Sequence, residues 1–164
     1  MPLIELPHTP GCLVCGRQNP VGLHLSLFVD TDTAEIRTRF TPGPQHIGFE
    51  GILHGGVLAT VLDEAMVWAA IWTSKKACVA GELNVRFRKS APVGEELHCL
   101  AKVKASRSRL VEVSGELALA DGTPIASGFG KYVPLAGEPT AAFMKTLVDE
   151  PPTSEAVRLL AVHR

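Results

Sequence analysis

The sequence predicts an α+β fold in which one antiparallel sheet wraps around one long central helix. Two observations predict it. Residues 57–72 run without Gly or Pro and provide about four helical turns. Several segments of alternating apolar and polar residues lie before and after this run, with no second helix among them. Parallel strands would need a crossover after each strand, so an antiparallel sheet is expected.

Length and composition favour one compact domain, and the N-terminal sequence favours a cytoplasmic location. The chain has 164 residues, 46% of them hydrophobic, and a net charge of −1. A chain of this size usually forms one core, and its charge balance gives no general attraction to nucleic acid or anionic membranes. The N-terminus has no secretory signal pattern. Residues 51–74 are apolar, but Asp63 and Glu64 at their centre argue against a membrane span.

The expected elements follow in chain order. Residues 1–22 form an N-terminal loop segment that contains a CxxC motif, residues 23–135 form the main domain, and residues 136–164 form a tail with two short helices. Within the domain, a hairpin precedes a loop over 41–53, the helix and a run of strands. The expected strands are 23–29, 34–40, 80–88, 95–106, 110–119 and 124–133.

The central helix is apolar on every face, which predicts a helix buried all round. The sheet can cover only part of it, so a partner subunit is expected on the remaining face. Asp63 and Glu64 are adjacent and point about 100° apart, so at least one of them faces protein. A structural ion pair, to Arg86 or Arg88, is one explanation, and a functional carboxylate is the other.

The start of the helix favours the functional explanation. Gly55 and Gly56 leave the first-turn N–H groups uncovered by side chains, which suits an oxyanion, although they could also simply permit a tight turn. Asp63 lies seven residues beyond Gly56, about 10 Å along the axis. The two groups can act on one carbonyl only if they come from two subunits, which predicts two equivalent sites in a homodimer.

The motifs resemble a known family. The string GILHGGVLATVLDE over 51–64 resembles the signature of hotdog-fold acyl-CoA thioesterases of the phenylacetic-acid-degradation (PaaI-like) type. CLVCGRQNPVGLHL, which begins at Cys12, and LNVRF followed by APVGE, which begin at Leu83 and Ala91, are similar to further parts of these proteins. The resemblance covers about residues 12–133. It implies a hotdog fold, a dimer or dimer of dimers, and hydrolysis of an acyl-CoA thioester.

The resemblance also implies roles for individual residues. Asp63 corresponds to the nucleophile or general base, with Glu64 as its replacement if the helix is rotated, and the N–H of Gly56 or Gly55 polarises the thioester carbonyl. His54 shapes the loop that enters the helix. An Asn that helps to position substrate in relatives corresponds to Gly48, so His46 or Gln45 takes that role or it is vacant. A hydroxyl residue of some relatives corresponds to Ala80.

The substrate needs a basic rim but no cofactor, since coenzyme A is itself part of the substrate. Arg86, Arg88 and Lys89 are candidates for its phosphates, although each could equally be an ordinary exposed charge. Cys12 and Cys15 supply half of a zinc site. His8 or a symmetry mate could complete it, but a structural cysteine pair is the preferred interpretation, and no metal is expected.

Three functions remain open. The preferred one is an acyl-CoA thioesterase, in which a carboxylate and a helix N-terminus act on the carbonyl. The second is an acyl-CoA-binding hotdog protein without turnover. The third is a hotdog enoyl-CoA hydratase or dehydratase, in which His54 or His46 would have to serve as the catalytic base.

Overall fold

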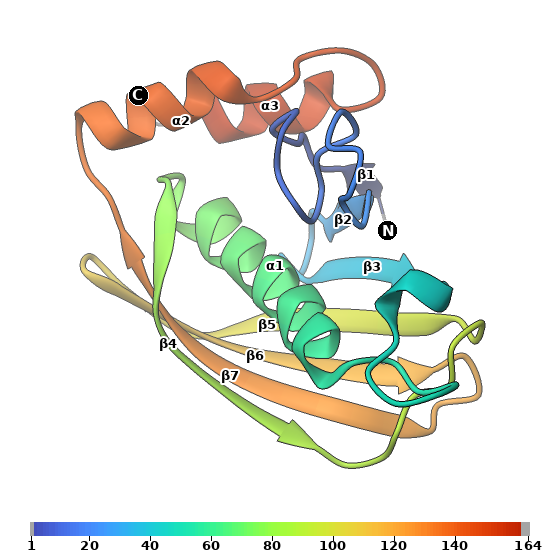
Figure 1. Cartoon of the computed structure of the whole chain (residues 1–164). Coiled ribbons are helices and arrows are strands. Elements are labelled where there is room, and N and C mark those ends of the chain that lie inside the picture. Colours follow the sequence, from blue (N-terminus) through green and yellow to red (C-terminus); the bar gives the residue numbers. More distant parts are fainter. Residues whose placement is uncertain (1, 162–164) are drawn as a thin grey trace.

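A computed structural model describes residues 2–161, and its core is a seven-stranded sheet that curls around one helix (Figure 1). The strand order is β1-β2-β3-β5-β6-β7-β4, and all neighbours are antiparallel. The predicted α+β architecture is confirmed. The elements are β1 (Leu3–Glu5), β2 (Leu27–Asp30), β3 (Ile36–Phe40), a 3-10 helix (Pro44–His46), α1 (Gly55–Ser74), β4 (Cys78–Phe87), β5 (Leu97–Arg107), β6 (Leu110–Leu119), β7 (Pro124–Pro134), α2 (Glu138–Thr146) and α3 (Ser154–Ala161).

The strands lie close to the predicted ranges, with one difference at the first hairpin. Strand β2 begins only at Leu27, because the N–H groups of Leu23 and Leu25 bond the carbonyls of Leu13 and Val14 instead of the neighbouring strand. His24, between them, has a positive φ of 52°. The short strand β1 was not predicted, since it pairs with β2 across a long loop.

Two glycines let α1 lie directly on the sheet. Gly115 on β6 and Gly128 on β7 are register partners. A Cβ at Gly115 would lie 3.0 Å from Leu62 Cδ2, and a Cβ at Gly128 would lie 3.0 Å from Met66 Cε. Leu62 and Met66 are fully buried. The glycine pair therefore forms a hollow for the middle of α1, beside the two acidic residues.

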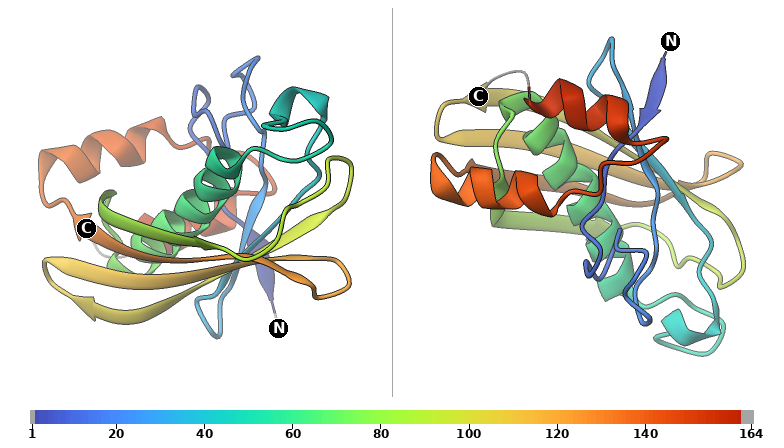
Figure 2. Two further views of the ribbon diagram at one scale, coloured as in Figure 1. Left: turned by 60° about the horizontal axis from the view of Figure 1, so that its bottom comes forward. Right: turned by 90° about the horizontal axis from the view of Figure 1, so that it is seen from above.

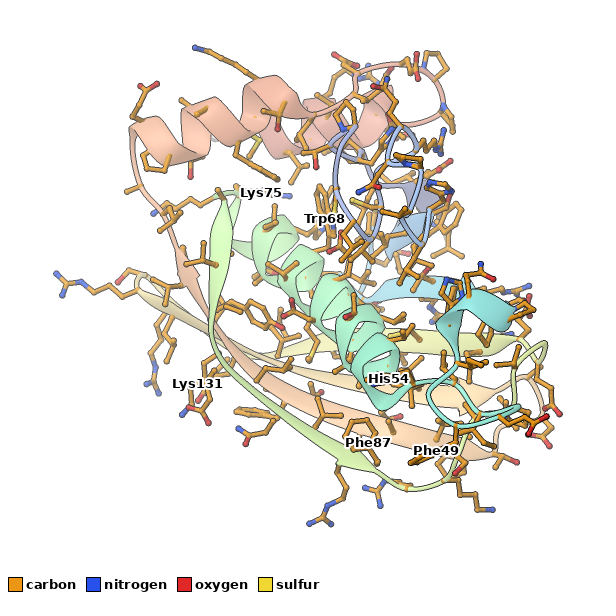
Figure 3. The ribbon with its side chains drawn as sticks, in the orientation of Figure 1. Phe49, His54, Trp68, Lys75, Phe87 and Lys131 are labelled. Carbon is orange, nitrogen blue, oxygen red and sulfur yellow. The ribbon has the colours of Figure 1, made fainter. Side chains whose placement is uncertain are left out.

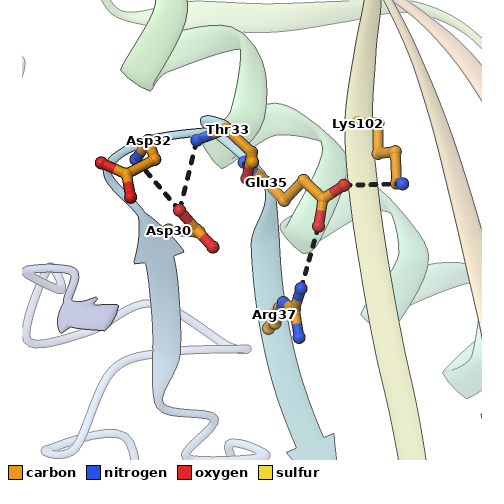
Figure 4. A network of polar contacts seen from close by, with 6 residues as sticks. All are labelled: Asp30, Asp32, Thr33, Glu35, Arg37 and Lys102. Carbon is orange, nitrogen blue, oxygen red and sulfur yellow. Dashed lines mark hydrogen bonds and ion pairs between the residues drawn. The ribbon is translucent and has the colours of Figure 1, made fainter. Parts of the chain in front are cut away.

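The turn between β2 and β3 is fixed by a buried aspartate (Figure 4). Asp30 Oδ1 accepts hydrogen bonds from the N–H groups of Asp32, at 3.0 Å, and Thr33, at 3.2 Å. Glu35 then pairs with Arg37 and with Lys102 of β5. The hydrogen bond from Lys102 lowers the pKa of Glu35. These contacts fix the turn and attach it to the neighbouring strand β5.

The two ends of the chain pack together over the C-terminal half of α1 (Figure 2). The N–H of Val148 donates to the carbonyl of His8 at 3.0 Å, and α3 contacts β1. Phe143 of α2 packs against Trp68, with 6.1 Å between ring centroids. By length and composition alone α1 could cross a membrane, but 56% of its apolar window is buried inside the protein. We therefore describe α1 as a helix of the protein core.

Within the single chain, α1 keeps one stripe partly open, as expected for a face that the sheet does not cover. Gly56, Ala59, Thr60, Asp63 and Val67 recur with helical spacing, and none of them is fully buried. Among the described residues, the edge strand β4 pairs on one side only, with β7. Leu83, Val85 and Phe87 of β4 alternate toward the helix side of the sheet, and Leu83 and Phe87 are exposed there. A partly open apolar face thus runs along α1 and β4.

Candidate active site

The first turn of α1 is capped by His54. This residue has extended backbone angles, φ −62° and ψ 132°, and its Nδ1 accepts a hydrogen bond from the N–H of Gly56 at 2.8 Å. The expectation that no side chain covers the first-turn N–H groups is therefore wrong for Gly56. The N–H of Gly55 has no acceptor within residues 2–161. Gly55 thus offers the free donor of this turn.

The loop before the helix packs tightly on the cap. A Cβ at Gly48 would lie 3.2 Å from the Cα of His54, so this position has little room for the asparagine that the resemblance would put there. His46 is occupied locally: its Nδ1 accepts from the N–H of Gly43 at 3.0 Å, and its ring lies 5.3 Å from that of Phe40. His46 supports the loop and does not line the cleft described next.

A cleft of about 520 Å³ opens at the start of α1. Five of the residues predicted from the sequence line it: Gly48, His54, Gly55, Arg88 and Lys89. Five others do not: His46, Gly56, Asp63, Glu64 and Arg86. The remaining walls are largely apolar, with Phe49, Leu58 and Phe87 among them. Figure 3 shows Phe49 and Phe87 beside His54 below the helix start. The cleft therefore combines a helix N-terminus, two cations and apolar walls.

Asp63 lies on the half-exposed stripe of α1 and is held by a tyrosine. The hydroxyl of Tyr132 on β7 donates to Asp63 Oδ1 at 2.8 Å. Burial, together with the adjacent Asp63 carboxylate, raises the pKa of Tyr132, so its hydroxyl stays protonated and donates. Tyr132 is the single tyrosine of the chain and was not predicted as a site residue. It is the register partner of Ala80, the position where some relatives have a hydroxyl residue.

Glu64 is turned about 100° around the helix from Asp63 and points into the core. Its side chain is 9% exposed, and its Oε1 accepts a hydrogen bond from Trp68 Nε1 at 3.2 Å. Burial raises the pKa of Glu64 to about 7. Neither acid forms an ion pair within the described residues, so the alternative of a structural pair with Arg86 or Arg88 is wrong. The two carboxylates occupy separate environments.

Comparisons with known proteins relate this chain to the thioesterase superfamily. Residues 50–126 match the model of the thioesterase superfamily. A crystal structure of a thioesterase superfamily protein superimposes with a TM-score of 0.69 and 27% identity, covering 76% of this chain and 60% of that one. The PaaI protein of E. coli, from the phenylacetic acid degradation operon, gives a TM-score of 0.65 and 21% identity, covering 70% and 82%. The resemblance to hotdog thioesterases is confirmed, and the likeness to PaaI concerns the fold.

This chain also has a relative among curated protein sequences. An uncharacterized mitochondrial protein of Candida albicans is 31% identical over 93 residues, which is 56% of this chain and 41% of that protein. The chain thus spans about two fifths of that relative. Among hotdog structures, a Streptococcus mutans protein bound to acetyl CoA has a TM-score of 0.60 and 14% identity, covering 63% and 83%. This likeness concerns the fold.

Proposed function

We propose that this PaaI-like hotdog protein hydrolyses acyl-CoA thioesters to a free acid and coenzyme A. One observation carries the proposal: a carboxylate held by a buried hydroxyl faces the open stripe of α1, while a free helix N-terminal N–H lines a cleft. A carboxylate and a fixed donor are what thioester hydrolysis requires. The matched superfamily model and the acetyl CoA bound to the Streptococcus mutans protein support the substrate class.

The proposed site is shared between two subunits. Asp63 lies about 10 Å along the helix axis from the first-turn glycines, too far for both to contact one carbonyl. We place a second copy on the open face of α1 and β4, where half-exposed Val67 and exposed Leu83 favour burial against protein. A twofold axis there would bring Asp63 of each subunit toward Gly55 of the other. Pairing of such dimers into a tetramer is compatible with the proposal.

Each residue then has a defined task. The N–H of Gly55 stabilises the negative charge that develops on the thioester oxygen. Asp63 of the other subunit takes a proton from the water that attacks the carbonyl carbon, and the coenzyme A thiolate leaves. Alternatively, Asp63 attacks the carbon itself and displaces the thiolate, and water then hydrolyses the resulting anhydride to the free acid and restores Asp63. Arg88 and Lys89 at the cleft bind phosphates of coenzyme A. Arg86 lies outside the cleft lining and is not assigned this role.

A thioester panel tests the proposal. Purified protein is given short, long and aryl acyl-CoA thioesters, and thiol release is measured. Release above the uncatalysed rate is expected for at least one class. Thermal stabilisation by acyl-CoA without any release would instead favour the binding protein. Hydration of an enoyl-CoA, measured in parallel, would favour the hydratase, although no acid bonds His54 or His46 within residues 2–161.

Tyr132 is predicted to position Asp63. In Tyr132→Phe the hydrogen bond to Oδ1 is lost while the ring still fills its buried place. A hydrogen bond to a charged group contributes about 1.5–3 kcal/mol. We expect kcat to fall by roughly tenfold with KM nearly unchanged, because the ring does not line the cleft. Steady-state kinetics on the best substrate of the panel provides the test, and an equal rise in KM would contradict it.

A further inference from the structure

A second cluster of reactive side chains lies on the other side of α1 and has no part in thioester hydrolysis. The thiols of Cys12 and Cys15 and the carboxylate of Glu64 have ligand atoms that all lie within 4.8 Å of one another. Cys12 Sγ is 3.9 Å from Glu64 Oε1, although 52 positions separate the two residues in the chain. The fold therefore brings the CxxC loop onto the middle of the central helix.

The loop that carries the cysteines is held in one conformation. The N–H of Val14 donates to Cys12 Sγ at 3.4 Å, and the N–H of Gly16 donates to the carbonyl of Cys12 at 3.0 Å. A Cβ at Gly16 would lie 2.4 Å from the backbone N of Cys12, so this turn requires glycine. A tight turn of this kind directs both sulfur atoms to one side before any ligand binds.

The carboxylate of Glu64 lacks a cationic partner. Cys15 is 3% exposed and Glu64 is 9% exposed, and Trp68 Nε1 is the nitrogen donor that Glu64 contacts. No Lys, Arg or His pairs with Glu64 within the described residues. A buried carboxylate without a counter-charge costs several kcal/mol. A divalent cation bound here would supply the counter-charge that the chain does not.

We propose that Cys12, Cys15 and Glu64 bind a zinc ion, with water in the fourth position. A tetrahedral zinc with bonds of about 2.3 Å to sulfur and about 2.1 Å to oxygen separates these atoms by ~3.6 Å. The observed 3.9 Å between Cys12 Sγ and Glu64 Oε1 needs only a small adjustment. Two thiolates select zinc over magnesium or calcium, and each thiol releases its proton when zinc binds.

The third ligand differs from the one that the sequence suggested. His8 is buried, but it is not part of the cluster found among the described residues. Glu64 belongs to the helix that carries Asp63, so the proposed zinc fastens residues 12–15 to α1 next to the active-site carboxylate. The role that follows is structural: the zinc closes the long segment between Cys15 and Glu64 and stabilises the fold.

Zinc content of the untagged full-length protein tests the proposal. We expect about one zinc per chain after purification under reducing conditions, and less than about a tenth of this in Cys12→Ser/Cys15→Ser. Glu64→Gln should weaken zinc binding at least tenfold in chelator competition. Cys78→Ser is the matched control, since Cys78 is also a half-buried free thiol but lies on β4 outside the cluster. It should retain full zinc.

Measurements on the unmodified protein remain decisive if a variant does not fold. Added Co²⁺ should give thiolate-to-metal charge-transfer absorption, and Zn²⁺ should protect Cys12 and Cys15, but not Cys78, from alkylation followed by peptide mass spectrometry. Reduced protein that takes up neither ion would overturn the proposal. So would a protein isolated without metal in which Cys12 and Cys15 form a disulfide, which would indicate a redox pair. None of these readouts depends on thioesterase activity.

Discussion

Replacing Asp63 by Asn is expected to lower kcat for acyl-CoA hydrolysis by about 10³-fold, because an amide can neither attack the carbonyl nor accept a proton from water. Asn has nearly the same shape, and the hydroxyl of Tyr132 can still donate to its side-chain oxygen. The fold should therefore persist. The measurement is thiol release on the best substrate of the panel, with the melting temperature recorded beside it.

Glu64→Gln is the comparison variant for this change, and its melting temperature is recorded with its activity because the substitution also removes the proposed zinc ligand. It removes the neighbouring carboxylate of α1, which lies in the core beside Trp68 and outside the proposed active site. The proposal for Asp63 predicts that hydrolysis depends on Asp63 far more than on Glu64. A loss of similar size in Glu64→Gln with the melting temperature preserved would assign the chemistry to Glu64. Full activity in Asp63→Asn would remove the proposed mechanism.

Mixing two inactive variants tests whether the site is shared. Gly55→Pro removes the backbone N–H of the first helical position, where proline is well tolerated. His54 already has the φ and ψ that a residue before proline adopts. If Asp63 and Gly55 act from different subunits, an equal mixture of Asp63→Asn and Gly55→Pro regains about a quarter of the wild-type activity, since half of the dimers are mixed and each has one intact site. If they act within one chain, mixing restores nothing.

The order of the elements could be predicted because it depends on local patterns. Alternation defined β5, β6 and β7, and the uninterrupted apolar run defined α1. The same patterns could not locate β1, whose three residues gain their structure from pairing with β2. They indicated that the sheet leaves one face of α1 uncovered, but not which residues form it, because that depends on how far the sheet curls around the helix.

The sequence could predict only those parts of the candidate site whose residues are neighbours in the chain. The string around His54 and Gly55 places both in the cleft. Tyr132 was missed because strand alternation indicates its face but not that its hydroxyl reaches Asp63 on the helix. The capping of Gly56 depends on the rotamer of His54, which spacing does not determine. Glu64 and Cys12 meet only through the tertiary fold.

The close approach of α1 to the sheet leads to the largest expected effect on stability. Valine at Gly128 would place its Cβ 3.0 Å from Met66 Cε and its methyl groups closer still, in a hollow that Leu62 and Met66 already fill. Overpacking of this kind costs about 1–3 kcal/mol. Since about 1 kcal/mol shifts the melting temperature of a chain of this size by roughly 2–4 °C, we expect Gly128→Val to melt about 2–12 °C lower.

A control and a rescue separate overpacking from the general effect of valine. Gly81 also lies in a strand, but a Cβ there would meet only ordinary contacts, 3.5 Å from the carbonyl oxygen of Lys131, so Gly81→Val should change the melting temperature little.

Combining Gly128→Val with Met66→Ala frees volume at the point of contact, and the double variant should be more stable than the sum of the two single changes predicts. Simple additivity would show that α1 and the sheet do not meet at this glycine. The larger side chain would push α1 away from the sheet and move Asp63. The hydrolysis rate of Gly128→Val, measured at a temperature well below its melting temperature, should therefore be lower than that of the wild type and should recover in the double variant.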